Sequence, residues 1–391
     1  MRGFTRPIGY ALAMLAAGTA MPLAAADFPE PLPEEPIPAT ATLPGRYPDS
    51  WVFVHDLFFD SLLDGRAAIV DVAADNHQLK GQVPVAQFGN ITISSARGEI
   101  LTGETFHSRL TRGERTDVLT LWDMKTLTPK DEIVLPGGKR GLFVTLRNNL
   151  QLTNDDKWAL VFNFTPAASV TVVDLDGRRI LSDIDLPGCS LTYPTGARGF
   201  SSLCADGTLT TVTLDAAGKA AATTSGKPFN DIDNNPMFMT PAMVGRTAWF
   251  VTFKGSIRGI DFSGATPRDL GSFNLPATDG GAPEWRPGGW QVISSDKAGR
   301  LYVLMNPAGK EGSHKDGGTE VWVVDPAKKA RLLRIPLKNH SVSVEATQQE
   351  KPLLVASRPD GALDVYDGAT GALVRTIVGS AHDPMTMTAV R

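Results

Sequence analysis

The sequence predicts an all-β protein: a seven-bladed β-propeller whose ring is closed by a C-terminal strand that completes blade one. The first observation is a repeated unit, in which a strand ends at an Asp and a tight turn leads back into a second strand. The unit recurs at Asp71, Asp123, Asp174, Thr213, Asp261, Asp325 and Asp367. Successive marks are 39 to 64 residues apart, and seven antiparallel units at a period of this order are typical of a propeller. The second observation is the apolar segment 385–390, which has no strand partner nearby in the sequence. We expect it to be the innermost strand of blade one, because ring closure removes open sheet edges.

The clearest unit is residues 117–136, DVLTLWDMKTLTPKDEIVLP. Its first half alternates β-branched and aromatic side chains with leucines, which is the periodicity of a strand. Asp123 suits the end of that strand, since its carboxylate can accept hydrogen bonds from backbone N–H groups just ahead of it in the turn. In the weakest copy, Thr213 takes the place of the Asp.

The remaining strands follow in chain order. Blade one is expected to contribute strands 51–54, 67–71 and 79–85, with a longer excursion over 56–64. Blade two is expected at 91–95, 100–107, 117–123 and 132–135, and blade three at 150–153, 158–163, 169–174 and 180–186. Four further blades are expected at about 190–226, 238–274, 290–337 and 341–378, the sixth with a long insertion over 306–318.

The first 26 residues are predicted to be a secretory signal peptide. A basic start is followed by an apolar run over 8–20 and by the small-residue pattern Ala24-Ala25-Ala26. The run is short for a membrane span, which disfavours the alternative of an uncleaved anchor. Residues 27–49 are rich in Pro, Glu and Ala and are predicted to be a flexible arm, and residues 50–391 are predicted to be the propeller. These features predict a periplasmic protein with no membrane span.

Charge and cysteine content narrow the function classes. Removal of residues 1–26 would change the formal net charge from −4 to −6, which argues against a nucleic-acid partner. The two cysteines, Cys189 and Cys204, lie in a chain expected in an oxidising compartment, where nearby cysteines usually pair. A redox-active pair is the alternative, although the spacing is not that of a C-x-x-C motif.

The common signatures of catalysis and metal binding are missing from the sequence. There is no G-x-S-x-G, H-E-x-x-H or phosphate-binding glycine loop, and the six histidines have no metal-ligand spacing. Asp155-Asp156 is interpreted as part of a turn rather than a catalytic carboxylate pair. Arg109, Arg112 and Arg115 are interpreted as a solvated connection, with a docking surface as the alternative. We therefore assign no catalytic residue and no metal ligand to this chain.

Several longer motifs resemble the heavy (alpha) subunit of the quinoprotein amine dehydrogenases. They are SRLTRGERTDVLTLWDMKTL (108–127), WRPGGW (285–290), GKEGSHK (309–315) and EVWVVD (320–325). The resemblance extends from about residue 51 to the C-terminus. The segments NPAGKEGSHK (306–315) and NPMFMTPAMV (235–244) are more similar to the aralkylamine (aromatic amine) dehydrogenase chain than to the methylamine dehydrogenase chain.

The resemblance implies a seven-bladed propeller that pairs with a small light (beta) subunit in a periplasmic α2β2 heterotetramer. In that family the light subunit carries the tryptophan tryptophylquinone cofactor, so this chain is expected to bind no cofactor itself. The enzyme oxidises primary amines to aldehyde and ammonia and passes electrons to a blue-copper protein, azurin or amicyanin. The paired cysteines of the family match Cys189 and Cys204. A methylamine dehydrogenase heavy chain and a periplasmic propeller that only binds a ligand remain the alternatives.

The resemblance also points to aromatic side chains that would line a substrate channel. Phe59, in the excursion after the first strand, falls where the family places a Phe that narrows the channel. Phe58 beside it is a second candidate, and Phe106 falls where an aromatic residue lies in the aralkylamine chains. The alternative for each is a Phe that packs within the propeller.

Overall fold

The computed structural model describes residues 32–35, 41–141, 145–275 and 284–391. The chain divides into two compact units, 1–40 and 41–391. Of the first unit only residues 32–35 are described, and they form neither helix nor strand. The predicted signal peptide, 1–26, lies outside the described residues.

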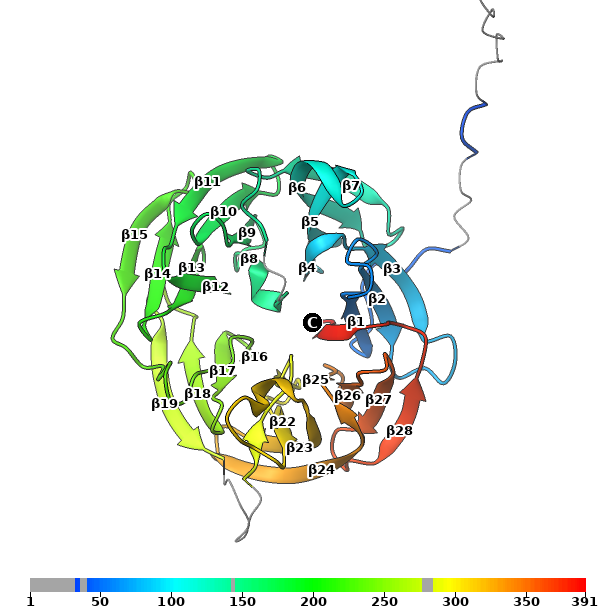
Figure 1. Ribbon diagram of the computed structural model, residues 1–391, viewed down its shortest axis with the longest axis vertical. Coiled ribbons are helices and arrows are strands. Elements are labelled where there is room, and N and C mark those ends of the chain that lie inside the picture. The colour runs from blue at the N-terminus through cyan, green and yellow to red at the C-terminus, as the bar shows by residue number, and fades with distance from the viewer. Residues whose placement is uncertain (1–31, 36–40, 142–144, 276–283) are drawn as a thin grey trace, which may run out of the picture. The chain divides into compact units, whose positions relative to one another are not determined.

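Residues 41–391 form seven antiparallel sheets arranged around a central axis (Figure 1). Blade one contains β1 (Trp51–Asp56), β2 (Arg66–Asp71), β3 (Leu79–Pro84) and β29 (Pro384–Ala389). Blade two contains β4 (Gln87–Ser94), β5 (Glu99–Arg109), β6 (Arg112–Asp123) and β7 (Pro129–Val134). Blade three contains β8 (Leu150–Leu152), β9 (Trp158–Asn163), β10 (Ser169–Asp174) and β11 (Arg179–Asp185). Blade four contains β12 (Cys189–Pro194), β13 (Gly199–Cys204), β14 (Leu209–Leu214) and β15 (Ala220–Ser225).

The last three blades complete the ring. Blade five contains β16 (Ala242–Val244), β17 (Thr247–Val251), β18 (Ser256–Asp261) and β19 (Arg268–Asn274). Blade six contains β20 (Arg286–Pro287), β21 (Ile293–Ser295), β22 (Leu301–Asn306), β23 (Gly318–Asp325) and β24 (Ala330–Ser341). Blade seven contains β25 (Ser343–Ala346), β26 (Leu353–Ser357), β27 (Leu363–Asp367) and β28 (Leu373–Ile377). Two short 3-10 helices, η1 (Arg147–Asn149) and η2 (Ser313–Lys315), are the helices of the described residues.

The predicted closure of the ring is confirmed. β29 pairs antiparallel with β1, with Met387 opposite Val54, and it is the innermost strand of blade one. The side chain of Met387 packs into a cluster that joins blade one to blade seven through Val355 and Val365. The last strand of the chain therefore completes the first blade and buries apolar surface against the last one, which leaves the ring without an open seam.

Burial falls from the inside of each blade to the outside. All six residues of β9 are buried, as are those of β1 and β22, because a neighbouring blade covers each face of these strands. All six residues of the outermost strand β15 are exposed. This gradient explains why the middle strands read as continuous apolar runs in the sequence, whereas the outer strands read as polar.

The turn that follows the third strand of each blade is fixed by an Asp. The carboxylate of Asp123 accepts a hydrogen bond from the N–H of Lys125 at 2.8 Å, and Asp367 accepts one from Ala369 at 2.9 Å. The expectation that Thr213 takes this role in blade four is wrong. Asp215 accepts the N–H of Ala217 at 2.9 Å, because the strand runs on to Leu214 before the chain turns.

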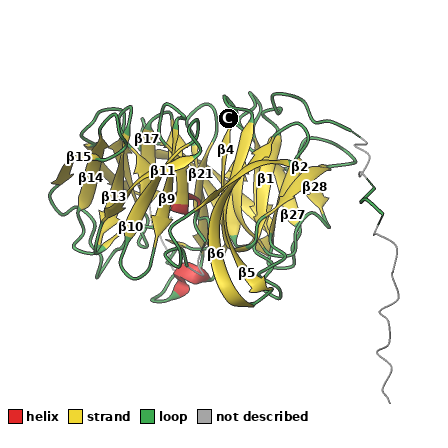
Figure 2. Cartoon of the chain, turned by 90° about the horizontal axis from the view of Figure 1, so that it is seen from above, coloured by secondary structure: helices red, strands yellow, loops and turns green. Residues whose placement is uncertain are grey.

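The hairpin of β5 and β6 is longer than predicted, and it extends beyond the ring at the lower side of Figure 2. The strands continue past His107 until Arg109 pairs with Arg112 across the turn. The interpretation of the three arginines as a solvated connection is therefore wrong for Arg115. Its guanidinium lies on β6, binds Asp117 at 3.0 Å and stacks on the ring of Phe88.

Two further contacts hold the ring together. Tyr47, in the segment that the sequence placed in a flexible arm, is 1% exposed and packs beside Trp51 with ring centroids 4.9 Å apart. Residues 41–49 thus lie on the propeller. Cys189 and Cys204 form the expected disulfide, which links adjacent ends of β12 and β13.

Candidate functional site

One face of the ring gathers the exposed aromatic side chains. The hairpin face is the face formed by the connections between the second and third strands of the blades: 57–65, 110–111, 164–168, 205–208, 252–255, 307–317 and 358–362. Antiparallel alternation puts all of these connections at the same end of their blades. Phe59 and Phe164 lie in these connections with 44% and 51% exposure, and Phe106 lies near the tip of the β5–β6 hairpin with 42%. Exposed apolar side chains mark an interaction site where they form a contiguous patch.

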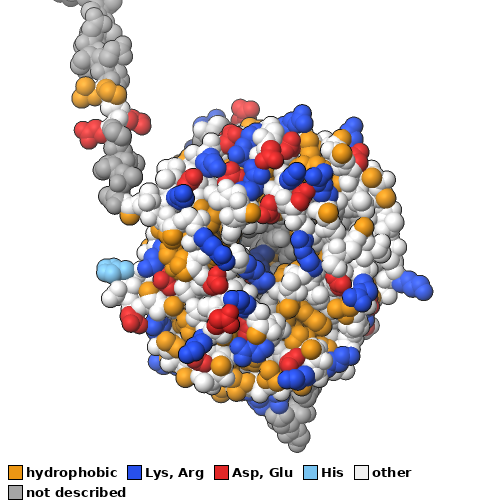
Figure 3. Space-filling view, turned by 180° about the vertical axis from the view of Figure 1, so that it is seen from behind, with side chains coloured by type: hydrophobic (Ala, Val, Ile, Leu, Met, Phe, Trp, Pro, Cys, Tyr) orange, Lys and Arg blue, Asp and Glu red, His pale blue; other side chains and the backbone are white. Residues whose placement is uncertain are grey.

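The face seen from behind in Figure 3 carries side chains of both charges. In the view from behind, Lys and Arg side chains lie among Asp and Glu side chains around the central opening (Figure 3). Arg97, in the turn between β4 and β5 of blade two, reaches Asp176, in the turn after β10 of blade three, at 2.8 Å. Such pairs of opposite charge link one blade to the next.

Phe59 and Trp290 form an aromatic pair on the hairpin face. Their ring centroids are 6.0 Å apart and the ring planes are inclined by 59°. The indole N–H of Trp290 donates to the backbone carbonyl of Thr145 at 3.1 Å, which fixes the orientation of that ring. The pair therefore joins the 57–65 connection of blade one to the inner edge of blade six and to the segment that enters blade three.

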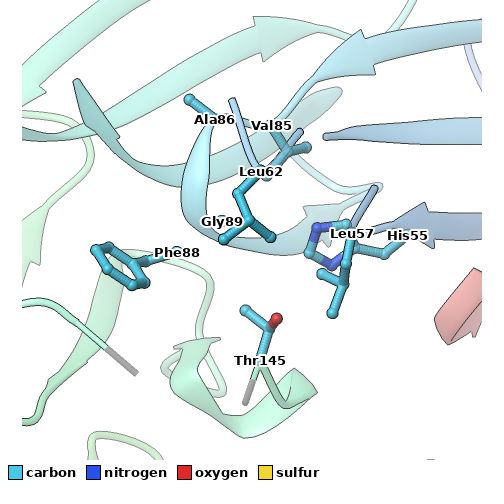
Figure 4. Close-up of a pocket in the computed structure, with 8 residues that line it drawn as sticks. All are labelled: His55, Leu57, Leu62, Val85, Ala86, Phe88, Gly89 and Thr145. Carbon is cyan, nitrogen blue, oxygen red and sulfur yellow. The ribbon is translucent and has the colours of Figure 1, made fainter. Parts of the chain in front are cut away.

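A small cavity lies next to this pair (Figure 4). Its volume is about 20 Å³, which is room for about one water molecule. The lining residues are mainly apolar and come from blades one and two and the segment before blade three: His55, Leu57, Leu62, Val85, Ala86, Phe88, Gly89 and Thr145. A cavity of this size does not hold an organic substrate, so at this place the chain offers a wall rather than a complete pocket.

His55 is the titratable group of the cavity, and it is neutral at physiological pH. It lies at the end of β1 with 4% exposure, and its Nδ1 is 3.4 Å from the hydroxyl of Thr386 on β29. Burial lowers the pKa of His55 to about 4, although the neighbouring Asp56 acts in the opposite direction. The imidazole therefore contributes hydrogen bonding and shape rather than charge.

The loop that carries Phe58 and Phe59 is held in an unusual conformation. Phe58 has φ of 47°, in the left-handed region that side chains other than Gly rarely adopt. Its N–H donates to the carboxylate of Asp56 at 3.2 Å, and its ring packs edge-on against His382 with centroids 5.0 Å apart. Phe58 thus faces away from the aromatic pair and serves the shape of the loop, while Phe59 is presented at the surface.

Phe106 lies on β5, opposite Thr116 of β6. No ring contact joins it to Phe58 or Phe59 in the described part of the chain. The structure therefore brings Phe59 together with Trp290 and leaves Phe106 on a separate arm of the same face.

Arg140 binds the backbone of Phe88, a residue that lines the cavity. This fully buried guanidinium donates to the carbonyl oxygens of Phe88 and Gly103 at 2.7 and 2.9 Å and to the side chain of Asn90 at 2.7 Å. Burial lowers the pKa of Arg140 to about 10, so that it stays charged at neutral pH. Its bonds hold the irregular start of β4, where Phe88 has φ of 55°.

The remaining candidates from the sequence are structural. Asp155 and Asp156 occupy the turn between β8 and β9, as interpreted, and Asp155 binds Arg198 at 2.6 Å. Within the described ranges, no group of three or more His, Cys, Asp or Glu side chains is arranged to hold a metal ion. No helix among those residues is long and apolar enough to cross a membrane.

Trp290, Arg140 and Asp383 were not predicted from the sequence as site residues. Trp290 follows two glycines in WRPGGW, which signals close backbone packing but not the blade it faces. Arg140 and Asp383 carry no local signal, because their partners are distant in the sequence.

The structure therefore defines a seven-bladed propeller with exposed aromatic side chains on its hairpin face. A family model described as "Methylamine dehydrogenase heavy chain (MADH)" matches residues 60–390. The methylamine dehydrogenase heavy chain of Methylorubrum extorquens is 31% identical over 81% of this chain and 75% of its own length. That of Methylophilus methylotrophus is 29% identical over 80% of this chain and 77% of its own length.

Solved structures add evidence on the fold alone. A Bacteroides fragilis protein provisionally assigned as a 6-phosphogluconolactonase superposes with a TM-score of 0.58 at 13% identity, over 90% of this chain and 99% of its own. A dihydro-heme d1 dehydrogenase superposes with a TM-score of 0.51 at 16% identity, over 89% of this chain and 78% of its own. On the match of the family model and its relatives, the chain belongs to the methylamine dehydrogenase heavy chain family.

Proposed function

We propose that this chain is the heavy subunit of a periplasmic tryptophan tryptophylquinone amine dehydrogenase. The observation that carries the proposal is the exposed aromatic face on a chain of this family, with the Phe59–Trp290 pair beside a cavity too small for substrate. In the proposal, a light subunit that carries the quinone covers the hairpin face in an α2β2 heterotetramer. The complex oxidises a primary amine to an aldehyde and ammonia and passes electrons to a blue-copper protein, azurin or amicyanin.

In the proposed reaction the light subunit and this chain have different roles. The quinone of the light subunit oxidises the amine. This reaction needs a base and a pocket from which water is excluded. The apolar side chains around Phe59 supply one wall of that pocket. Phe59 limits the size of the amine, because its exposed ring points out of a loop that is fixed by hydrogen bonds.

For the substrate, we propose primary amines with an aromatic or aralkyl group. The support is the indole ring of Trp290, which lies beside Phe59 and offers aromatic surface to a ring-bearing substrate. Methylamine is the second candidate, and it is favoured by the relatives, which are methylamine dehydrogenase heavy chains at 28–31% identity.

The substitution Phe59→Ala tests the role of the wall. We expect the ratio of kcat/KM for phenethylamine to that for methylamine to rise about tenfold, since an apolar pocket discriminates by about 1–3 kcal/mol per methylene. The matched control is Phe164→Ala, which removes an equally exposed ring from blade three of the same face. If the kcat/KM ratio is unchanged in Phe59→Ala, Phe59 only packs within the propeller and does not line the channel. A preference of the parent enzyme for methylamine would establish the second candidate.

A further inference from the structure

The loop of Phe59 is bound to the segment that precedes the closing strand. The N–H of Phe59 donates to Oδ2 of Asp383 at 2.8 Å, and the N–H of Leu57 donates to the carbonyl of the same residue at 3.2 Å. In return, the N–H groups of His382 and Asp383 donate to the two carboxylate oxygens of Asp56, each at 2.8 Å. The two segments are more than 320 residues apart in sequence, and each supplies a carboxylate for the backbone of the other.

We propose that Asp383 is the positioning residue that holds Phe59 in place at the wall of the substrate channel. The inference rests on the proposed function in so far as Phe59 forms that wall. Hydrogen bonds from an N–H to a carboxylate are about twice as strong as those between neutral groups. The bond from Phe59 to Asp383 is therefore the principal restraint on a residue whose side chain is 44% exposed.

The surroundings of Asp383 strengthen this assignment. Its carboxylate is 16% exposed, and Oδ2 lies 3.0 Å from Nδ1 of His382, whose ring in turn packs on Phe58. A left-handed φ is energetically unfavourable for a residue with a side chain such as Phe58, so the turn needs hydrogen bonds on both sides to persist. Asp56 and Asp383 provide them at Phe58 and Phe59 respectively. The segment that leads into β29 thus positions the loop that carries Phe59, while β29 itself closes the ring.

The charged groups around this network are few. His382 lies 3.8 Å from Asp60, and Asp56 lies 3.4 Å from Nε of Arg66. Arg66 partly balances the buried carboxylate of Asp56, and Asp60 is exposed to solvent. Removal of the Asp383 carboxylate therefore takes away the acceptor of Phe59 without leaving a buried cation unpaired.

The test compares Asp383→Ala and Asp383→Asn in the enzyme as purified from its host. The first readout is amide hydrogen exchange of a peptide that spans Phe59, which reports the bond whether or not Phe59 affects substrates. We expect exchange to be about tenfold faster in Asp383→Ala and intermediate in Asp383→Asn, since Asn retains a neutral acceptor. The control is Asp360→Ala, which removes an exposed Asp from the connection of blade seven on the same face.

The second readout is the ratio of kcat/KM for phenethylamine and methylamine. We expect Asp383→Ala to move this ratio in the same direction as Phe59→Ala, and the double variant to move it no further than Phe59→Ala alone. Unchanged exchange at Phe59 in Asp383→Ala would overturn the proposal, and so would an additive effect in the double variant. If Phe59→Ala leaves the ratio unchanged while exchange accelerates in Asp383→Ala, the wall role of Phe59 is wrong and the anchoring by Asp383 stands.

Discussion

At the scale of single residues, the buried histidine of the cavity makes stability depend on pH. His55 has a folded-state pKa of about 4 against an ordinary value of 6.5. Between these values the unfolded chain binds a proton that the folded chain does not, so this component of the free energy of unfolding is lost as the pH falls. The component is fully present above about pH 6.5.

The variant His55→Gln, which cannot take up the proton, isolates this effect. Between pH 7 and pH 5 we expect the free energy of unfolding to fall by about 2 kcal/mol more in the parent protein than in the variant, at about 1.4 kcal/mol per pKa unit. Urea unfolding at the two pH values measures the difference. The exposed residue His77 supplies the control variant His77→Gln. Equal pH dependence in the parent and His55→Gln would contradict the assignment of a neutral buried imidazole.

Individual residues were the hardest part of the site to predict from the sequence. The identity of Phe59 as a candidate came from the resemblance to a family, and its partner Trp290 is far away in the sequence. Asp383 is separated from Phe59 by 324 residues, and no local pattern marks a carboxylate that accepts a hydrogen bond across the closure of a ring. The position of Thr213 was also predicted wrongly from the sequence. The Asp that fixes the turn of blade four is Asp215, two residues later than the periodicity indicated.

At the scale of elements, the strands were predictable because their signals are local. Each middle strand is covered on both faces by neighbouring blades, so its residues must be apolar or β-branched throughout, as in β9 and β22. The Asp at the end of the third strand marks the turn, because its carboxylate bonds to backbone N–H groups within three residues. The extra length of the β5–β6 hairpin was missed, since Arg109 and Arg112 are polar residues that resemble a loop.

The β5–β6 hairpin should act as a docking element for the partner subunit. Leu110 at its tip is 77% exposed, and Phe106 is 42% exposed. We expect Phe106→Glu and Leu110→Glu to lower the amount of light subunit retained on purification by about tenfold, because a charge buried in an apolar interface costs several kcal/mol unless it is paired.

A variant on the outer rim controls for this experiment. Leu332→Glu places the same charge on β24, where the side chain is 49% exposed, and it should retain the partner in full. The thermal unfolding of all three variants should match that of the parent, since each substitution is at an exposed position. Full retention of the partner by both hairpin variants would mean that the hairpin lies outside the interface.

At the scale of the whole molecule, the seven-bladed ring and its closure by residues 384–389 were predictable from the repeat. A propeller buries its surface between neighbours, so the count of repeats determines the architecture. The face that meets a partner was not predictable in the same way. The hairpin face is assembled from seven connections far apart in sequence, and its exposed aromatic side chains come to one face only when the ring is complete.

The central claim is that this ring is one subunit of a quinone-dependent amine dehydrogenase. The most direct measurement is purification of the protein from the periplasm of its own host, followed by gel analysis and a visible absorption spectrum. We expect a second, small subunit to co-purify and a quinone band to bleach when phenethylamine or another primary amine is added. A single colourless chain that is unaffected by amines would contradict the account and would indicate a propeller that only binds a ligand.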